Sequence, residues 1–161
     1  MPMPFLAPGD LENAGLSSTA ISISNPLVQE ESLLRTSLMP GQLKIISYNQ
    51  SHRIKKLKFF EIGHVYLPSE DNQLLPDERE YLSISIAGGD ATEIVAILDM
   101  ISLTMAFPNM QLKQQEIEGL HPGRSAQVFV AGQERGAVGE IDPRVLKNYG
   151  IDDSVAWLEL D

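Results

Sequence analysis

The run 120–150 constrains the fold of this chain more sharply than any other stretch. Apolar residues alternate with smaller or polar ones over residues 126–130, the chain can reverse at Gly132, and a second strand-like segment leads to Ile141. Two strands joined by a short glycine-containing loop form a β-hairpin. The sequence therefore predicts an antiparallel hairpin in this run, preceded by a turn at residues 121–124.

Two helices have clear start and stop signals. After the hairpin, Asp142 can cap a helix, Pro143 suits its first position and Gly150 marks its end. An earlier helix, from Asp90 to about Ala106, opens with a capping box, in which an aspartate and a glutamate three residues later satisfy each other's main-chain amides. The apolar stripe of this helix has helical spacing and consists of Ile94, Ile97, Leu98, Ile101 and Met105.

Shorter patterns define the remaining elements. They are a short helix at 10–14, a strand at 20–24, a helix at 29–34, a helix from Pro40 to about His52, and strands at 57–66, 81–87, 111–117 and 154–160. Composition places the strand at 57–66 in the centre of the sheet, the strand at 111–117 at an edge, and a polar, acidic loop at 68–79. Because hairpins outnumber β-α-β units, we predict a single α+β domain whose mostly antiparallel sheet is flanked by helices.

The charge balance limits what the chain can bind. Asp and Glu number 22 against 12 Lys and Arg, a net charge of −10, which disfavours a surface that follows a phosphate backbone. The one basic run, Arg53, Lys55, Lys56 and Lys58, is interpreted as a solvated helix end. The lack of cysteine excludes disulfides and thiolate sites, and no apolar run approaches the ~20 residues of a membrane span. A cytoplasmic setting is expected.

His121 and Arg124 flank a Pro-Gly turn and are the first candidate site. Their side chains and the turn amides can converge on an anion, which would suit a small stand-alone enzyme that binds an anion or a nucleotide. Alternatively, Arg124 pairs with a carboxylate such as Glu118 or Glu140 and fixes the loop. We favour the structural alternative.

Arg35 presents the same choice. Placed between two predicted helices, it can clamp a phosphate or donate to the free carbonyls of a helix end. The three histidines of the sequence are not spaced as metal ligands, and carboxylates such as Glu61, Glu140 and Asp142 are interpreted as partners of arginines. We therefore assign no catalytic, cofactor-binding or metal-ligating residue from the sequence.

Three blocks of the sequence resemble one known family. They are NPLVQEESLLRTSLMPGQL at 25–43, LKFFEIGHVY at 57–66, and HPGRSA followed by GAVGEIDPRVLKNYGI within 121–151. In this order and spacing they are similar to the synthetase-like core module of the bacterial phenylalanyl-tRNA synthetase beta subunit. The blocks make up about a third of the chain and are spread over residues 25–151.

The resemblance implies the class II aminoacyl-tRNA synthetase fold without its catalytic residues. It implies that residues 1–161 are one non-catalytic core domain, truncated at its N-terminus, in an enzyme of two alpha and two beta subunits. This module would contact the alpha subunit, tRNA would be bound by other parts of the enzyme, and ATP and magnesium would belong to the assembled ligase. The chain alone is expected to be inactive, and part of its apolar helix surface, tested best at Leu98 and Ile101, is expected to form the subunit contact.

Overall fold

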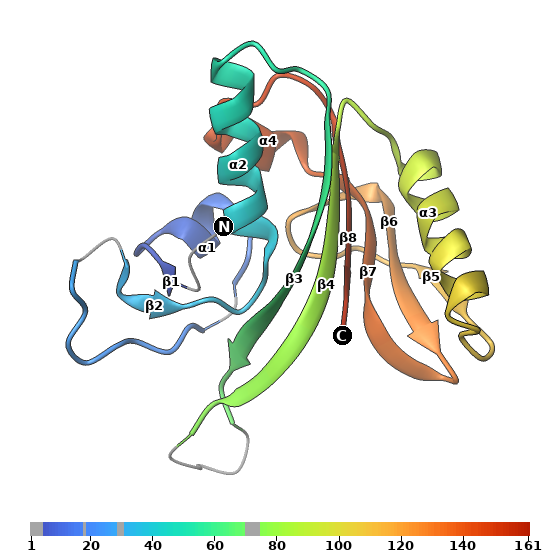
Figure 1. The fold of residues 1–161 in the computed structure, drawn as a ribbon, viewed down its shortest axis with the longest axis horizontal. Coiled ribbons are helices and arrows are strands. Elements are labelled where there is room, and N and C mark those ends of the chain that lie inside the picture. Colours follow the sequence, from blue (N-terminus) through green and yellow to red (C-terminus); the bar gives the residue numbers. More distant parts are fainter. Residues whose placement is uncertain (1–4, 18, 29–30, 70–74) are drawn as a thin grey trace.

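The computed structural model describes residues 5–17, 19–28, 31–69 and 75–161, and within these ranges six strands form one antiparallel sheet with helices on both faces (Figure 1). The elements are β1 (Phe5–Leu6), α1 (Asp10–Asn13), β2 (Leu33–Leu34), α2 (Met39–Ser51), β3 (Leu57–Leu67), β4 (Asp77–Ala87), α3 (Ala91–Thr104), β5 (Gln111–Gln114), β6 (Leu120–Val130), β7 (Gln133–Ile141), α4 (Pro143–Asn148) and β8 (Val155–Leu160). The strand order is β3-β4-β8-β7-β6-β5, and β1 pairs separately with β2. The predicted α+β class is confirmed.

The hairpin and the two helices with clear end signals form as predicted. Strands β6 and β7 pair on either side of Gly132, and the Asp142 carboxylate accepts a hydrogen bond from the Arg144 amide at 2.7 Å to cap α4. The Asp90 carboxylate accepts from the Glu93 amide at 2.9 Å at the start of α3. The Glu93 carboxylate pairs with Lys58 of β3 instead of completing the capping box.

The sheet is packed on both faces. Strand β8 lies in its interior, and every residue of β8 is buried. On one face Val155 and Trp157 join the apolar side of α2 and α4, and on the other face Leu158 joins α3. Leu98 of α3 has no exposed surface and belongs to this second core. The expectation that Leu98 contacts another subunit is therefore wrong, because the sheet already covers it.

The N-terminal third departs from the predictions. The expected strand at 20–24 is reduced to one bridge between Ser22 and Leu33. In place of the expected helix at 29–34, residues 33–34 form strand β2, while residues 29–30 lie outside the described ranges. The physical reason is tertiary pairing: main-chain hydrogen bonds join these two segments, and β2 also pairs with β1, so the helical pattern does not decide the conformation.

Strand β3 lies at an edge of the sheet, not in its centre as predicted. Its composition misled because apolar side chains occupy both faces, yet Phe60 and Ile62 are exposed. The predicted loop at 68–79 is shorter, since β4 begins at Asp77, and residues 70–74 lie outside the described ranges. The predicted edge position of residues 111–117 is confirmed for β5.

A polar contact joins α2 to the sheet. Gln42 is fully buried, and its amide oxygen accepts hydrogen bonds from the hydroxyls of Ser83 at 3.0 Å and Ser85 at 2.5 Å on β4. Its amide nitrogen donates to the Ser83 carbonyl at 3.3 Å. Buried polar groups are tolerated when they are hydrogen-bonded, so this contact fixes the position of α2 over β4.

We predict that Gly136→Ala destabilises the chain far more than Gly132→Ala. A Cβ atom at Gly136 would lie 1.9 Å from the Glu159 main-chain oxygen, at a φ of +145°. Gly132 also has a positive φ, but no atom would meet its Cβ within 4 Å. Urea unfolding should show a loss of about 3 kcal/mol or more for Gly136→Ala and about 1 kcal/mol for the control. Equal losses would contradict close packing of β7 on β8.

Candidate functional site

A cleft of about 520 Å³ lies on the face of the sheet that carries α2, beside the first turn of that helix. Its walls come from the segment before α2, the first half of β4, the end of β8 and facing parts of β6 and β7. Glu159 and Asp161 project from the end of β8 into this region, and Trp157 lines it from the same strand. Hence segments far apart in the sequence meet here.

The Glu159 carboxylate joins β8 to the start of α2. One oxygen accepts from the Ser37 hydroxyl at 2.9 Å, and the other accepts from the Leu38 amide at 2.7 Å. The Ser37 hydroxyl in turn accepts from the Met39 amide at 3.1 Å. The first amides of a helix have no partner within the helix, so this carboxylate and the serine together cap α2.

Burial raises the pKa of Glu159 to about 7, against the opposing effect of the hydrogen bonds from Leu38 and Ser37. Arg35 also opposes the rise, and the carboxylate of Glu61 adds to it. The folded chain therefore favours the protonated carboxyl more than the unfolded chain does. The stabilisation from this preference is complete below the ordinary pKa of 4.5 and is lost as the pH rises through about 7.

We predict that Glu159→Gln removes this pH dependence. The free energy of unfolding of the unmodified chain, minus that of the variant, should fall by about 3 kcal/mol between pH 4 and pH 8. Urea unfolding at unit steps of pH measures the difference. The matched control is Glu134→Gln, which makes the same substitution at an exposed carboxylate of the same cleft. A level profile for Glu159→Gln would contradict the assignment.

The two arginines of the cleft are already held by carboxylates. Arg79 lies 2.7 Å from Asp77 and 3.6 Å from Asp161, and Arg135 lies 3.4 Å from Asp161. The hydrogen bond with Asp77 raises the pKa of Arg79 further above its ordinary value. The described residues that line the cleft include two guanidinium groups and four carboxyl groups, those of Glu118, Glu134, Glu159 and Asp161. The cleft thus has a surplus of acidic groups.

Arg35 lies against the outer edge of β3. Its Nε atom donates to the His64 carbonyl at 2.7 Å, and Nη1 donates to Glu61 at 2.7 Å. The second oxygen of Glu61 is buried and has no partner among the described residues. The predicted position between two helices is wrong because β2, not a helix, precedes Arg35. The arginine secures a strand and not a helix end.

The structure assigns His121 and Arg124 to different networks. Arg124 donates to Glu140 at 2.6 Å, and the other oxygen of Glu140 accepts from the Ala91 amide at 3.1 Å at the start of α3. His121 accepts from the Gly123 amide at 3.1 Å and contributes to a lowered pKa of Asp142, whose main cause is the hydrogen bond from Arg144. The expected turn at 121–124 is part of β6, which has an irregular register between Leu120 and Ser125.

Sequence reasoning missed the residues that form the cleft. A carboxylate at position 159, inside the otherwise apolar segment VAWLEL, was the one available signal, because an acidic side chain in a buried strand requires a hydrogen-bond donor. The contribution of Arg79 and Asp77 was hidden by their assignment to a loop. Nothing in the sequence near Arg135 indicated that it would meet the chain end at Asp161.

The described residues contain no group of three or more His, Asp or Glu side chains placed to hold a metal ion. Within the same ranges, no helix has both the length and the apolar character needed to cross a bilayer.

Comparisons with known proteins agree with the fold. Residues 1–161 match the family described as "Phenylalanyl tRNA synthetase beta chain CLM domain". The phenylalanine–tRNA ligase beta subunit of Clostridium tetani is 35% identical over 145 residues, which cover 88% of this chain and 18% of that protein. The same subunit of Geobacter metallireducens is 31% identical over an alignment of 176 positions, which covers 98% of this chain and 22% of that protein. The chain thus spans about a fifth of these relatives.

Among solved structures, PylSc, a pyrrolysyl-tRNA synthetase of Desulfitobacterium hafniense, has a similar fold. The TM-score is 0.75 at 16% sequence identity, and the match covers 99% of this chain and 56% of that one. At this identity the likeness concerns the fold alone. It confirms the class II synthetase arrangement that the sequence resemblance implied.

Proposed function

Since the chain belongs to the family of the phenylalanyl-tRNA synthetase beta chain CLM domain, we propose that it is a non-catalytic, synthetase-like module of a beta subunit. In this role it supports assembly of a cytoplasmic enzyme of two alpha and two beta subunits that attaches phenylalanine to tRNA. The alpha subunit is its direct partner. Binding of ATP, magnesium and tRNA belongs to other parts of that enzyme.

The charge of the cleft is the observation that carries the non-catalytic part of this proposal. ATP brings several negative charges, and its phosphates are bound by free cationic donors or by a metal ion. Here Arg79 and Arg135 are engaged by Asp77 and Asp161, and further carboxylates line the same space. A triphosphate would have to break these pairs and approach acidic groups. The cleft therefore disfavours the substrate that a synthetase must activate.

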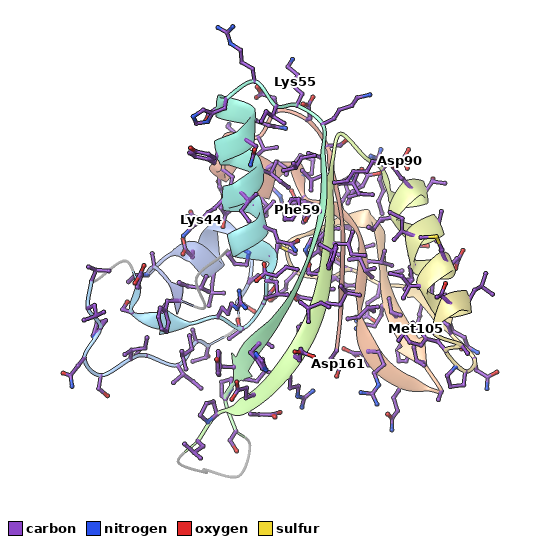
Figure 2. All side chains as sticks on the ribbon, viewed as in Figure 1. Lys44, Lys55, Phe59, Asp90, Met105 and Asp161 are labelled. Atoms are coloured by element: carbon purple, nitrogen blue, oxygen red, sulfur yellow. The ribbon has the colours of Figure 1, made fainter. Side chains whose placement is uncertain are left out.

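The outer side of α3 supports the assembly part. Leu103 and Met105 are 83% and 66% exposed, and Met100 beside them is also exposed. Figure 2 shows Met105 at the far end of α3 from Asp90. A group of large apolar side chains on the surface is typical of a contact with another protein. We therefore assign the subunit contact to this outer side, in place of the buried Leu98.

We predict that the chain co-purifies with the alpha subunit of a bacterial phenylalanyl-tRNA synthetase and that a double substitution, Leu103→Glu with Met105→Glu, prevents this. The carboxylates would have to be desolvated in the contact, whereas both positions are exposed in the free chain and tolerate charge. Co-expression followed by native mass spectrometry measures the complex. The control Lys147→Glu, an exposed position on α4, should leave the complex intact.

Circular dichroism must show that both variants are folded. ATP-dependent pyrophosphate exchange by the chain alone would overturn the non-catalytic assignment. A saturable ATP titration that is lost in Arg124→Ala would instead favour a small nucleotide-binding enzyme. Absence of a complex between the unmodified chain and the alpha subunit would overturn the assembly role.

A further inference from the structure

Strand β3 has an open main-chain edge. Its neighbour in the sheet is β4, and beyond it the Tyr66 amide donates to the Arg35 carbonyl at 2.8 Å. In an antiparallel strand, the amide and carbonyl of one residue point to the same side, and successive residues alternate. Lys58, Phe60 and Ile62 therefore direct their main-chain groups out of the sheet, as Tyr66 does. Among the described residues, the main-chain groups of Lys58, Phe60 and Ile62 have no hydrogen-bond partner.

The side chains of the same stretch are apolar and uncovered. Phe60 and Ile62 are 68% and 60% exposed. Their neighbours on β4 are Ile84 and Leu82, which are half-buried. Helix α3 packs on β7 and β8 and does not cover Phe60 and Ile62. Natural edge strands are usually protected by charge, proline or bulges against pairing with other chains. This stretch exposes main-chain groups and apolar side chains together.

A basic segment precedes the open edge. Arg53, Lys55 and Lys56 are exposed, and within the described ranges they form no ion pair. Figure 2 shows Lys55 projecting away from the chain between α2 and β3. The chain as a whole carries a net charge of −10. A local positive charge in this setting favours an acidic partner at this end of β3.

We propose that the open edge of β3, from Leu57 to Gly63, binds an extended acidic and apolar segment of a partner polypeptide as an added strand. The partner's main chain pairs with the free groups of β3, its alternate apolar side chains contact Phe60 and Ile62, and its carboxylates meet residues 53–56. This surface is separate from the outer side of α3. The proposal therefore goes beyond the assembly role and does not depend on it.

A second copy of the chain fits this edge less well. The two-fold register that uses the whole stretch from Leu57 to Gly63 is centred on Phe60. It would place Lys56 opposite His64 of the copy, whose carbonyl is already engaged by Arg35. The basic segment would then meet no carboxylate across the new pair. The charge pattern favours a different, acidic polypeptide.

A labelled peptide tests the proposal with the 161-residue chain as it stands. The probe is the amidated peptide Thr-Val-Thr-Ile-Thr-Glu-Thr-Glu, which in antiparallel orientation brings its apolar residues to β3 and its glutamates to the basic segment. We expect saturable binding by fluorescence anisotropy. Hydrogen exchange followed by NMR should slow at the amides of Lys58, Phe60 and Ile62, and stay unchanged at Phe59 and Glu61, which face β4.

Three variants and two altered peptides locate the contact. Phe60→Lys should weaken binding about tenfold or more, and so should joint reversal of Lys55 and Lys56 to glutamate. Tyr48→Lys, an aromatic position on α2 with nearly the same exposure as Phe60, should bind like the unmodified chain. A peptide methylated on its β3-facing amides and a peptide with lysines in place of its glutamates should both bind about tenfold more weakly.

Each remaining result would overturn the proposal. Absence of saturable binding, or binding that Phe60→Lys leaves unchanged, would remove the edge as the site. Equal binding of the lysine peptide would remove the acidic partner. The chain alone could dimerise in sedimentation, with slow hydrogen exchange at the amide of residue 60 that becomes fast in Phe60→Lys. That result would assign the edge to a second copy.

Discussion

The carboxylate of Glu159 connects the interior of the sheet to the helix that covers it. Strand β8 is flanked by β4 and β7 and is buried throughout, so its position is set by the whole sheet. Through Glu159 this fixed strand holds the Leu38 amide and the Ser37 hydroxyl, and these determine where α2 begins. A buried carboxylate without such donors would be strongly unfavourable. Burial is unfavourable for the charged carboxylate and raises the pKa of Glu159. The hydrogen bonds from Leu38 and Ser37 partly offset this effect, and they fix the start of α2.

The same principle recurs around the sheet, where arginines pair with carboxylates of neighbouring segments. Arg35 holds Glu61 on β3, and Arg124 holds Glu140, which also receives the first amide of α3. The first pair ties β3 to the segment before α2, and the second ties the hairpin of β6 and β7 to α3 through the Ala91 amide. A guanidinium group whose charge is balanced by a neighbouring carboxylate attracts a phosphate less strongly.

The sequence predicted the parts of the fold whose signals are local. Caps at Asp90 and Asp142 and the reversal at Gly132 act within a few residues, and they form as expected. The strand pairing of residues 33–34 and the edge position of β3 were missed because both depend on contacts with distant segments. For the same reason the cleft was not predicted: Asp161 meets Arg79 and Arg135 only after three strands are aligned. Periodicity reports which side chains are buried together, and it does not report which strands are neighbours.

The misplaced strand is also the most informative about function. A sequence with apolar residues on both faces indicates a strand that is covered on both sides. Strand β3 has this composition, and yet Phe60 and Ile62 are exposed at the edge of the sheet. The composition therefore fits an environment in which a further chain covers this stretch. Binding of an added strand along the open β3 edge would place β3 inside the sheet, which is the position that its composition predicts.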